Sequence, residues 1–168
     1  MAKVIRNTKQ LEAAMDKLMR KALDRTSEEV ELLISHFLQL WYDDYSPVKY
    51  KRTYQFLHSC VRSRVARHGK KYESRIYIDY KNMHHIMLSG GGTPDRPLKR
   101  SEELAIVQEA NRGRHGIKDG EKGFTEFRFW DEAMSKMNQD DYIINCFYNY
   151  LKSLGYNVEY NQSGAVPF

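Results

Sequence analysis

The fold depends on residues 8–43, TKQLEAAMDKLMRKALDRTSEEVELLISHFLQLWYD. Apolar side chains recur there every three or four residues, which is the spacing of one face of an α-helix. They are Leu11, Met15, Leu18 and Ala22 and, after a polar interval, Val30, Leu33, Phe37 and Trp41. In the interval, Thr26 and Glu29 have capping-box spacing, a signal for a helix N-terminus. The segment is therefore either one long amphipathic helix or two helices joined near residues 24–26.

The remainder of the chain alternates shorter helices and strands. A serine and a proline at positions 46–47 favour a helix start, and apolar spacing then predicts a helix that ends near His68. The stretch YESRIYIDY at residues 72–80 predicts a strand, with even-numbered side chains on one face and odd-numbered ones on the other. Further helices are expected at 101–111, 132–137 and 139–154, and a short strand at 124–130.

This mixture of elements favours the α+β class. We expect a long N-terminal amphipathic helix or helix pair packed on a small antiparallel sheet, with additional C-terminal helices. The chain has 168 residues, 41% of them apolar, so it can bury one core. Residues 1–168 are therefore expected to form a single domain.

Two polar, glycine-containing stretches, residues 89–97 and 112–123, are expected to be mobile loops. The first contains Gly90, Gly91 and Gly92, which cannot continue a regular element. It lacks the GxxxxGK[ST] pattern of a phosphate-binding loop, because no lysine follows the glycines at that spacing. A flexible surface connector is the simplest interpretation.

The charge pattern marks a contact surface. Residues 47–75 hold nine Lys or Arg and a single acid, Glu73, although the whole chain carries a net charge of only +5. Charge gathered in this way indicates either a solvated face or a surface that meets a polyanion or an acidic protein. The cations are Lys49, Lys51, Arg52, Arg62, Arg64, Arg67, Lys70, Lys71 and Arg75. Tyr50, Tyr54 and Tyr72 lie among them and are candidates to pack against a partner.

No constellation of residues predicts catalysis. Adjacent histidines at 84–85 would point to opposite faces of a strand, and no HExxH or Cys/His cluster supports a metal site. The acidic pairs at 43–44 and 140–141 fit the end and the start of a helix. Cys60 and Cys146 form no CxxC spacing and are expected to be reduced, buried thiols. We therefore expect no enzyme, no metal and no cofactor.

The order of parts resembles a known family. The matching pieces are the segments at 45–53 (YSPVKYKRT), 57–59 and 75–80, and the aromatic stretch FRFWDEAM at 127–134. Together they are similar to the small head–tail joining or tail-completion proteins of tailed bacteriophages, over about residues 10–135. The segment with the three glycines and the region beyond residue 137 depart from that pattern.

The resemblance implies a structural, non-enzymatic protein of phage morphogenesis. Such a protein would act as a ring of identical subunits at the head–tail interface of the virion, after assembly in the host cytoplasm. Its partners would be further copies of itself and other neck, portal or tail proteins. The basic segment would meet acidic subunit surfaces or, non-specifically, the DNA that passes through the neck. The alternative is a small cytosolic protein that binds nucleic acid non-specifically through residues 47–75. Neither role involves a membrane, because no apolar run is long enough to span one.

Overall fold

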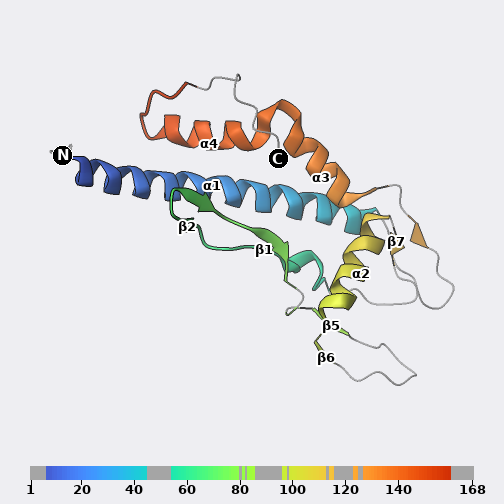
Figure 1. Ribbon diagram of the computed structural model, residues 1–168. Helices are drawn as coiled ribbons and strands as arrows, with labels where there is room; N and C mark the ends of the chain where they lie inside the picture. Colours follow the sequence, from blue (N-terminus) through green and yellow to red (C-terminus); the bar gives the residue numbers. More distant parts are fainter. Residues whose placement is uncertain are drawn as a thin grey trace.

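A single long helix forms the spine of the protein (Figure 1). The computed structural model describes residues 7–44, 54–79, 81, 83–85, 96–97, 99–112, 114–115, 123–124 and 127–159. Helix α1 runs without interruption over Thr8–Asp43, a length of 36 residues. Its N-cap is Asn7, whose side chain accepts a hydrogen bond from Gln10 N at 2.9 Å. Of the two alternatives for residues 8–43, the single helix is therefore the one observed.

The capping-box residues lie inside this helix and begin no new one. The Thr26 hydroxyl donates to Ala22 O at 2.9 Å, and the Ser27 hydroxyl donates to Asp24 O at 2.9 Å. Both side chains are buried, and bonding back to the preceding turn satisfies them without a helix break.

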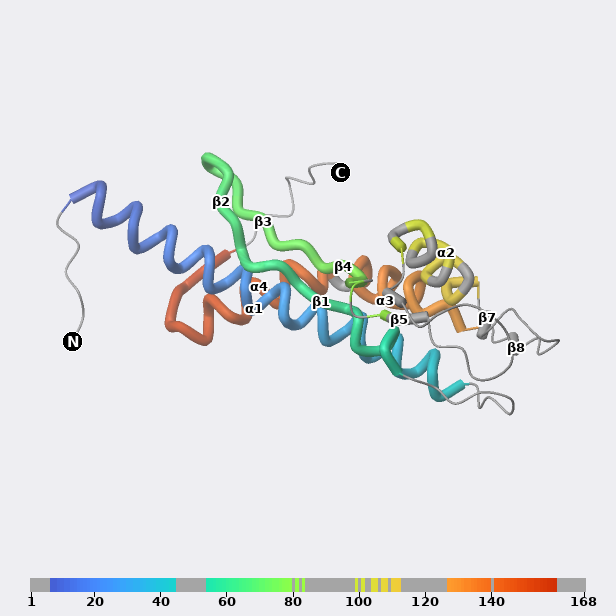
Figure 2. The backbone as a smooth tube through the Cα atoms, turned by 90° about the horizontal axis from the view of Figure 1, so that it is seen from below, coloured from blue at the N-terminus to red at the C-terminus, as the bar shows by residue number. Residues whose placement is uncertain are grey.

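A long antiparallel hairpin lies along one side of α1 (Figure 2). It consists of β1 (Cys60–Arg62), β2 (Ala66–His68), β3 (Lys71–Glu73) and β4 (Ile76–Ile78), in which β1 pairs with β4 and β2 pairs with β3. Gly69 makes the turn with a φ of +63°, a conformation that glycine adopts without steric cost. We call residues 60–78 the hairpin and residues 66–73 the hairpin tip.

The helix predicted to run from position 47 to about His68 is wrong over its described part. Leu57–Ser59 is only one turn of 3-10 helix (η1), and β1 and β2 follow it. The strand expected over 72–80 does occur as β3 and β4, with Ile78 buried and Tyr77 exposed as the alternation predicted. Strands β3 and β4 form backbone hydrogen bonds with residues 60–68. Because of this pairing, those residues are extended despite the helical spacing of their apolar side chains.

The C-terminal helices cover the other side of α1 (Figures 1 and 2). They are α3 (Phe129–Asn138) and α4 (Tyr142–Ser153), joined by a 3-10 turn, η3 (Gln139–Asp141). Helix α2 (Arg100–Asn111) packs on α3. Of the strand expected at 124–130, Phe124 lies in a short strand, residues 125–126 lie outside the described residues, and α3 already begins at Phe129. The α+β class, the long N-terminal helix and the added C-terminal helices are confirmed.

Four two-residue strands complete the described elements. β5 (His84–His85) pairs with β6 (Arg96–Pro97), and β7 (Arg114–His115) pairs with β8 (Gly123–Phe124). The predicted loops at 89–97 and 112–123 lie mostly outside the described residues, Gly90, Gly91 and Gly92 among them.

The core lies where α1, η1 and α3 meet. The rings of Trp41 and Phe56 are 5.8 Å apart, and Phe129 lies 5.8 Å from Phe56 and 6.5 Å from Trp41. All three pairs approach edge to face, the arrangement that aromatic quadrupoles favour. Phe129 and the adjacent Leu38 are fully buried, so this cluster fixes the C-terminal half of α1.

Two leucines of α1 allow a matched test of this core. Leu38 is 0% exposed and Leu32 is 58% exposed. We expect Leu38→Ala to lower the free energy of unfolding by about 2–5 kcal/mol, because it leaves a cavity. Leu32→Ala, with the same change in helix propensity, should alter it by less than about 0.5 kcal/mol. Urea unfolding followed by tryptophan fluorescence measures both, and equal effects would contradict the described packing.

Candidate interaction surface

The hairpin tip is attached to α1 by a cluster of polar groups around Asp16. The carboxylate accepts hydrogen bonds at 2.8 Å from Arg20 Nε, from Arg67 Nη1 and from the hydroxyl of Tyr72. The guanidinium carbons of Arg20 and Arg67 lie 5.8 and 5.6 Å from the centre of the Tyr72 ring. At these distances a cation is attracted to the face of the ring. We call Asp16, Arg20, Arg67 and Tyr72 the Asp16 cluster.

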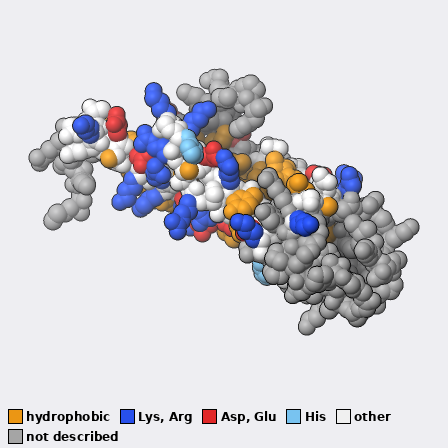
Figure 3. Space-filling view, turned by 60° about the horizontal axis from the view of Figure 1, so that its bottom comes forward, with side chains coloured by type: hydrophobic (Ala, Val, Ile, Leu, Met, Phe, Trp, Pro, Cys, Tyr) orange, Lys and Arg blue, Asp and Glu red, His pale blue; other side chains and the backbone are white. Residues whose placement is uncertain are grey.

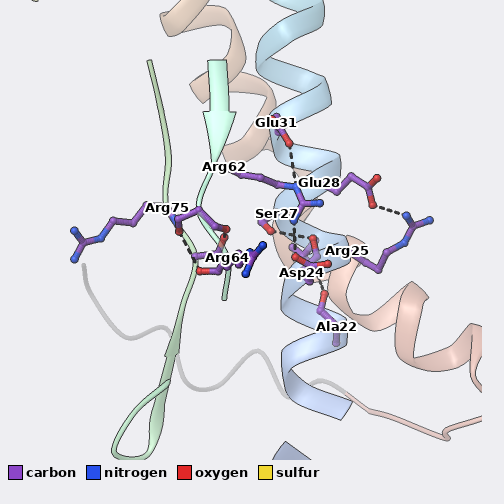
Figure 4. A network of polar contacts seen from close by, with 12 residues as sticks. Ala22, Asp24, Arg25, Ser27, Glu28, Glu31, Arg62, Arg64 and Arg75 are labelled. Atoms are coloured by element: carbon purple, nitrogen blue, oxygen red, sulfur yellow. Dashed lines mark hydrogen bonds and ion pairs between the residues drawn. The ribbon is translucent and has the colours of Figure 1, made fainter. Parts of the chain in front are cut away.

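A second polar cluster attaches the hairpin to α1 farther along the helix (Figure 4). Arg62 projects from β1 between two carboxylates of α1, binding Asp24 through Nη1 and Glu31 through Nε, the latter at 3.0 Å. The side chain of Arg62 is 26% exposed, so water screens these pairs less than it screens a fully solvated one. Two of the predicted contact cations, Arg62 and Arg67, therefore bind the chain's own helix.

The remaining described cations of the segment form no ion pair with α1 within the described residues. Arg75 points away from α1 (Figure 4). It pairs with Glu73 of the hairpin itself. Arg64, Lys70 and Lys71 are exposed, and within the described residues they have no ion-pair partner. We call these three residues the outer cations. Figure 3 shows Lys and Arg side chains gathered over the hairpin and the first half of α1.

The other predicted contact residues are found in several different settings. Lys49, Tyr50, Lys51 and Arg52 lie outside the described residues. Tyr54 is 45% exposed, and its ring is stacked on Tyr42 with centres 5.5 Å apart. Tyr72 belongs to the Asp16 cluster, where its hydroxyl is already engaged. The structure thus brings Arg67 and Tyr72 together and leaves Arg64 exposed.

Sequence reasoning missed the acids that pair with Arg62 and Arg67, which we call the inner cations. Asp16, Asp24 and Glu31 are spaced by about two helical turns, so they lie along one face of α1. Acids at this spacing, in a helix followed by a basic segment, were the available signal. Only the tertiary contact shows which cations they bind.

Neither cysteine is poised for reaction. Both are free, Cys60 being buried and Cys146 half-buried. Burial raises the pKa of the Cys60 thiol to about 11 and raises the pKa of Cys146 as well. Across the part of the chain that the structure describes, no group of His, Cys, Asp or Glu is arranged to hold a metal ion. Within those same residues, no helix is both long and apolar enough to cross a membrane.

Two arginines of the hairpin should differ in their effect on stability. Arg62→Ala removes the contacts with Asp24 and Glu31, and we expect it to lower the free energy of unfolding by about 1–2 kcal/mol. Arg64→Ala removes an exposed side chain with the same charge and should change it by less than about 0.5 kcal/mol. Chemical denaturation distinguishes them, and an equally large effect at Arg64 would contradict the division between inner and outer cations.

The Asp16 cluster should make stability depend on pH in two ranges. Its hydrogen bonds, foremost the one from Arg20, hold the pKa of Asp16 below its usual 3.8. The stabilisation is therefore complete above pH 3.8 and is lost as the pH falls through the lowered pKa. The hydrogen bond from Tyr72 to Asp16 raises the pKa of the phenol above its usual 10.0. That contribution is complete below pH 10.0 and is lost as the pH rises through the raised pKa.

We therefore expect Asp16→Asn to be less stable than the wild type near neutral pH, and the difference to shrink below pH 3.8. Urea unfolding at a series of pH values measures it. Glu12→Gln is the matched control, because Glu12 is exposed one turn earlier on the same helix. A difference between Asp16→Asn and the wild type that did not vary with pH would refute the assignment.

Comparison with known proteins places the chain in a family. The model of the YomN family matches residues 7–153, which include α1, the hairpin and the C-terminal helices. No curated protein matches the chain, and no solved structure does. The family name derives from a Bacillus phage, which suggests a phage-associated protein and does not indicate a particular step of assembly. The chain therefore belongs to the YomN family.

Proposed function

We propose that the chain is a structural protein of phage morphogenesis, without catalytic activity, that acts at the head–tail interface. In this role it forms a ring of identical subunits during neck or tail completion and contacts other neck, portal or tail proteins. It is assembled in the host cytoplasm and is then part of the virion. The phage-associated family and the resemblance of the sequence to head–tail joining proteins support this proposal.

The observation that carries the proposal is that the cations of the hairpin form two groups, one paired with α1 and one exposed without such a pair. The inner cations Arg62 and Arg67 are neutralised by carboxylates of α1, and these contacts hold the hairpin against a long helix. The outer cations are not needed for that attachment. Like charges gathered on one surface repel one another, so an intramolecular role does not account for them.

An acidic protein surface fits this arrangement as a partner. The hairpin already binds carboxylates on a helix through Arg62 and Arg67, so the same chemistry at the outer cations would bind a neighbouring subunit. A rigid, charged surface that is complementary to its partner also fixes the register of the contact. Joining two parts of a particle requires such a contact and no reaction.

Reversal of the outer cations tests the proposal. A variant with Arg64→Glu, Lys70→Glu and Lys71→Glu keeps the attachment of the hairpin to α1, so we expect its unfolding midpoint to stay near that of the wild type. Phage carrying it should yield DNA-filled heads lying apart from finished tails in electron micrographs, because the joining contact is lost. The control is Lys9→Glu, Lys136→Glu and Lys152→Glu, exposed positions outside the hairpin with the same total change in charge.

Intact, infectious particles from the outer-cation variant, or from a deletion of the gene, would contradict the proposal. The nucleic-acid alternative has its own readout. Binding of duplex DNA by the isolated chain at about 0.15 M salt, lost in the outer-cation variant while particles stay normal, would favour a non-specific DNA-binding protein.

A further inference from the structure

The two ends of the hairpin are attached to α1 in different ways. At the base, Cys60 and Ile78 are buried in the hydrophobic core. No residue of the tip, residues 66–73, is buried. The tip is held on α1 by the Asp16 cluster, in which the side chains of Arg67 and Asp16 are 45% and 24% exposed. Exposed ion pairs contribute little to stability, so the tip can leave the helix without unfolding the core.

A bulge separates the base from the tip. Residues 63–65 on one strand face residues 74–75 on the other, so the first strand carries an extra residue. Ser63 bridges the gap, since its hydroxyl accepts from Arg75 N at 2.9 Å and its carbonyl accepts from the Ser74 hydroxyl at 3.0 Å. A bulge of this kind bends a ribbon locally. The bulge therefore marks the point at which the ribbon bends between the base and the tip.

The part of α1 that receives the tip also carries an exposed apolar surface. Leu11 and Met15 are 48% and 47% exposed, and the helix there extends beyond the end of α4 (Figure 1). Their spacing continues the apolar stripe of α1, and apolar side chains at such spacing form the seam between paired helices. A second copy of α1 lying alongside would cover Leu11 and Met15 at an interaxial distance of about 8–10 Å.

We infer that neighbouring copies exchange hairpin tips. In the exchanged state, Arg67 and Tyr72 of one copy bind Asp16 of the next, as they bind Asp16 within one chain in the closed state. A tip of this length spans about 13 Å, which is enough to reach a helix packed alongside. Each copy carries both complementary surfaces, so exchange requires no new chemistry. The inference rests on the proposed function and supplies the contact through which its ring would form.

A charge swap distinguishes exchange between chains from closure within one chain. Asp16→Arg places like charges at positions 16 and 67 of one chain, and Arg67→Asp does so with the opposite sign in another. Each variant alone has a repulsive contact both within and between its chains. When the two are mixed, both contacts between chains are attractive, whereas the contacts within each chain stay repulsive. Exchange then predicts assemblies that contain both variants.

The measurement is size-exclusion chromatography with light scattering on the full-length variants. We expect each variant alone to elute as a single chain and the mixture to elute as a dimer or larger species containing both chains. The double variant, Asp16→Arg with Arg67→Asp, restores the contact within one chain. It should elute like the wild type, which also shows that the substituted positions allow folding.

A second mixture controls for non-specific attraction between chains of opposite charge. Glu12→Arg and Lys71→Asp change the net charge by the same amounts at exposed positions outside the Asp16 cluster. This mixture should remain monomeric. A monomeric charge-swap mixture, or association in both mixtures, would overturn tip exchange. The proposed function would survive that result if the outer-cation variant still failed to join heads to tails.

Discussion

The rest of the structure depends on the packing of α1 on two of its sides. A helix of this length gains most of its stability in water from tertiary contacts. One side of α1 is apolar and meets α3 and α4, and the other carries the acids that bind the hairpin. The apolar contact fixes the core around Leu38 and Phe129. The acidic contact decides which cations of the hairpin are paired with α1 and which stay exposed.

The fold could be predicted where apolar residues kept one spacing along a whole segment. The helix at 142–153 follows from apolar spacing, and the α+β class follows from the mixture of helices and strands. The continuity of α1 could not be predicted, because Thr26 and Glu29 match a helix start and only tertiary packing removes the need for one. The helix expected to end near His68 was wrong for a related reason: apolar spacing is local, whereas pairing depends on residues beyond the turn at Gly69.

The sequence identified the segment that carries the candidate surface, but it could not tell which side chains of that segment are exposed. Residues 47–75 are visibly basic, and the family and the resemblance both point to phages. Which cations lie inside depends on contacts such as Arg62 with Asp24 and Arg67 with Asp16. Those contacts join residues 38 and 51 positions apart. No local pattern encodes that distance, so the sequence could not separate Arg67 from Arg64.

Helix α1 is far in the sequence from the helices that cover it, α3 and α4. This separation has a consequence while the ribosome makes the chain. The apolar side of α1 leaves the ribosome early, whereas α3 begins only at Phe129. At roughly 5–20 residues per second, translation of the intervening chain takes on the order of ten seconds. During that interval the apolar stripe of α1 lacks α3 and α4, and only η1 and the hairpin, which are made earlier, can pack on it.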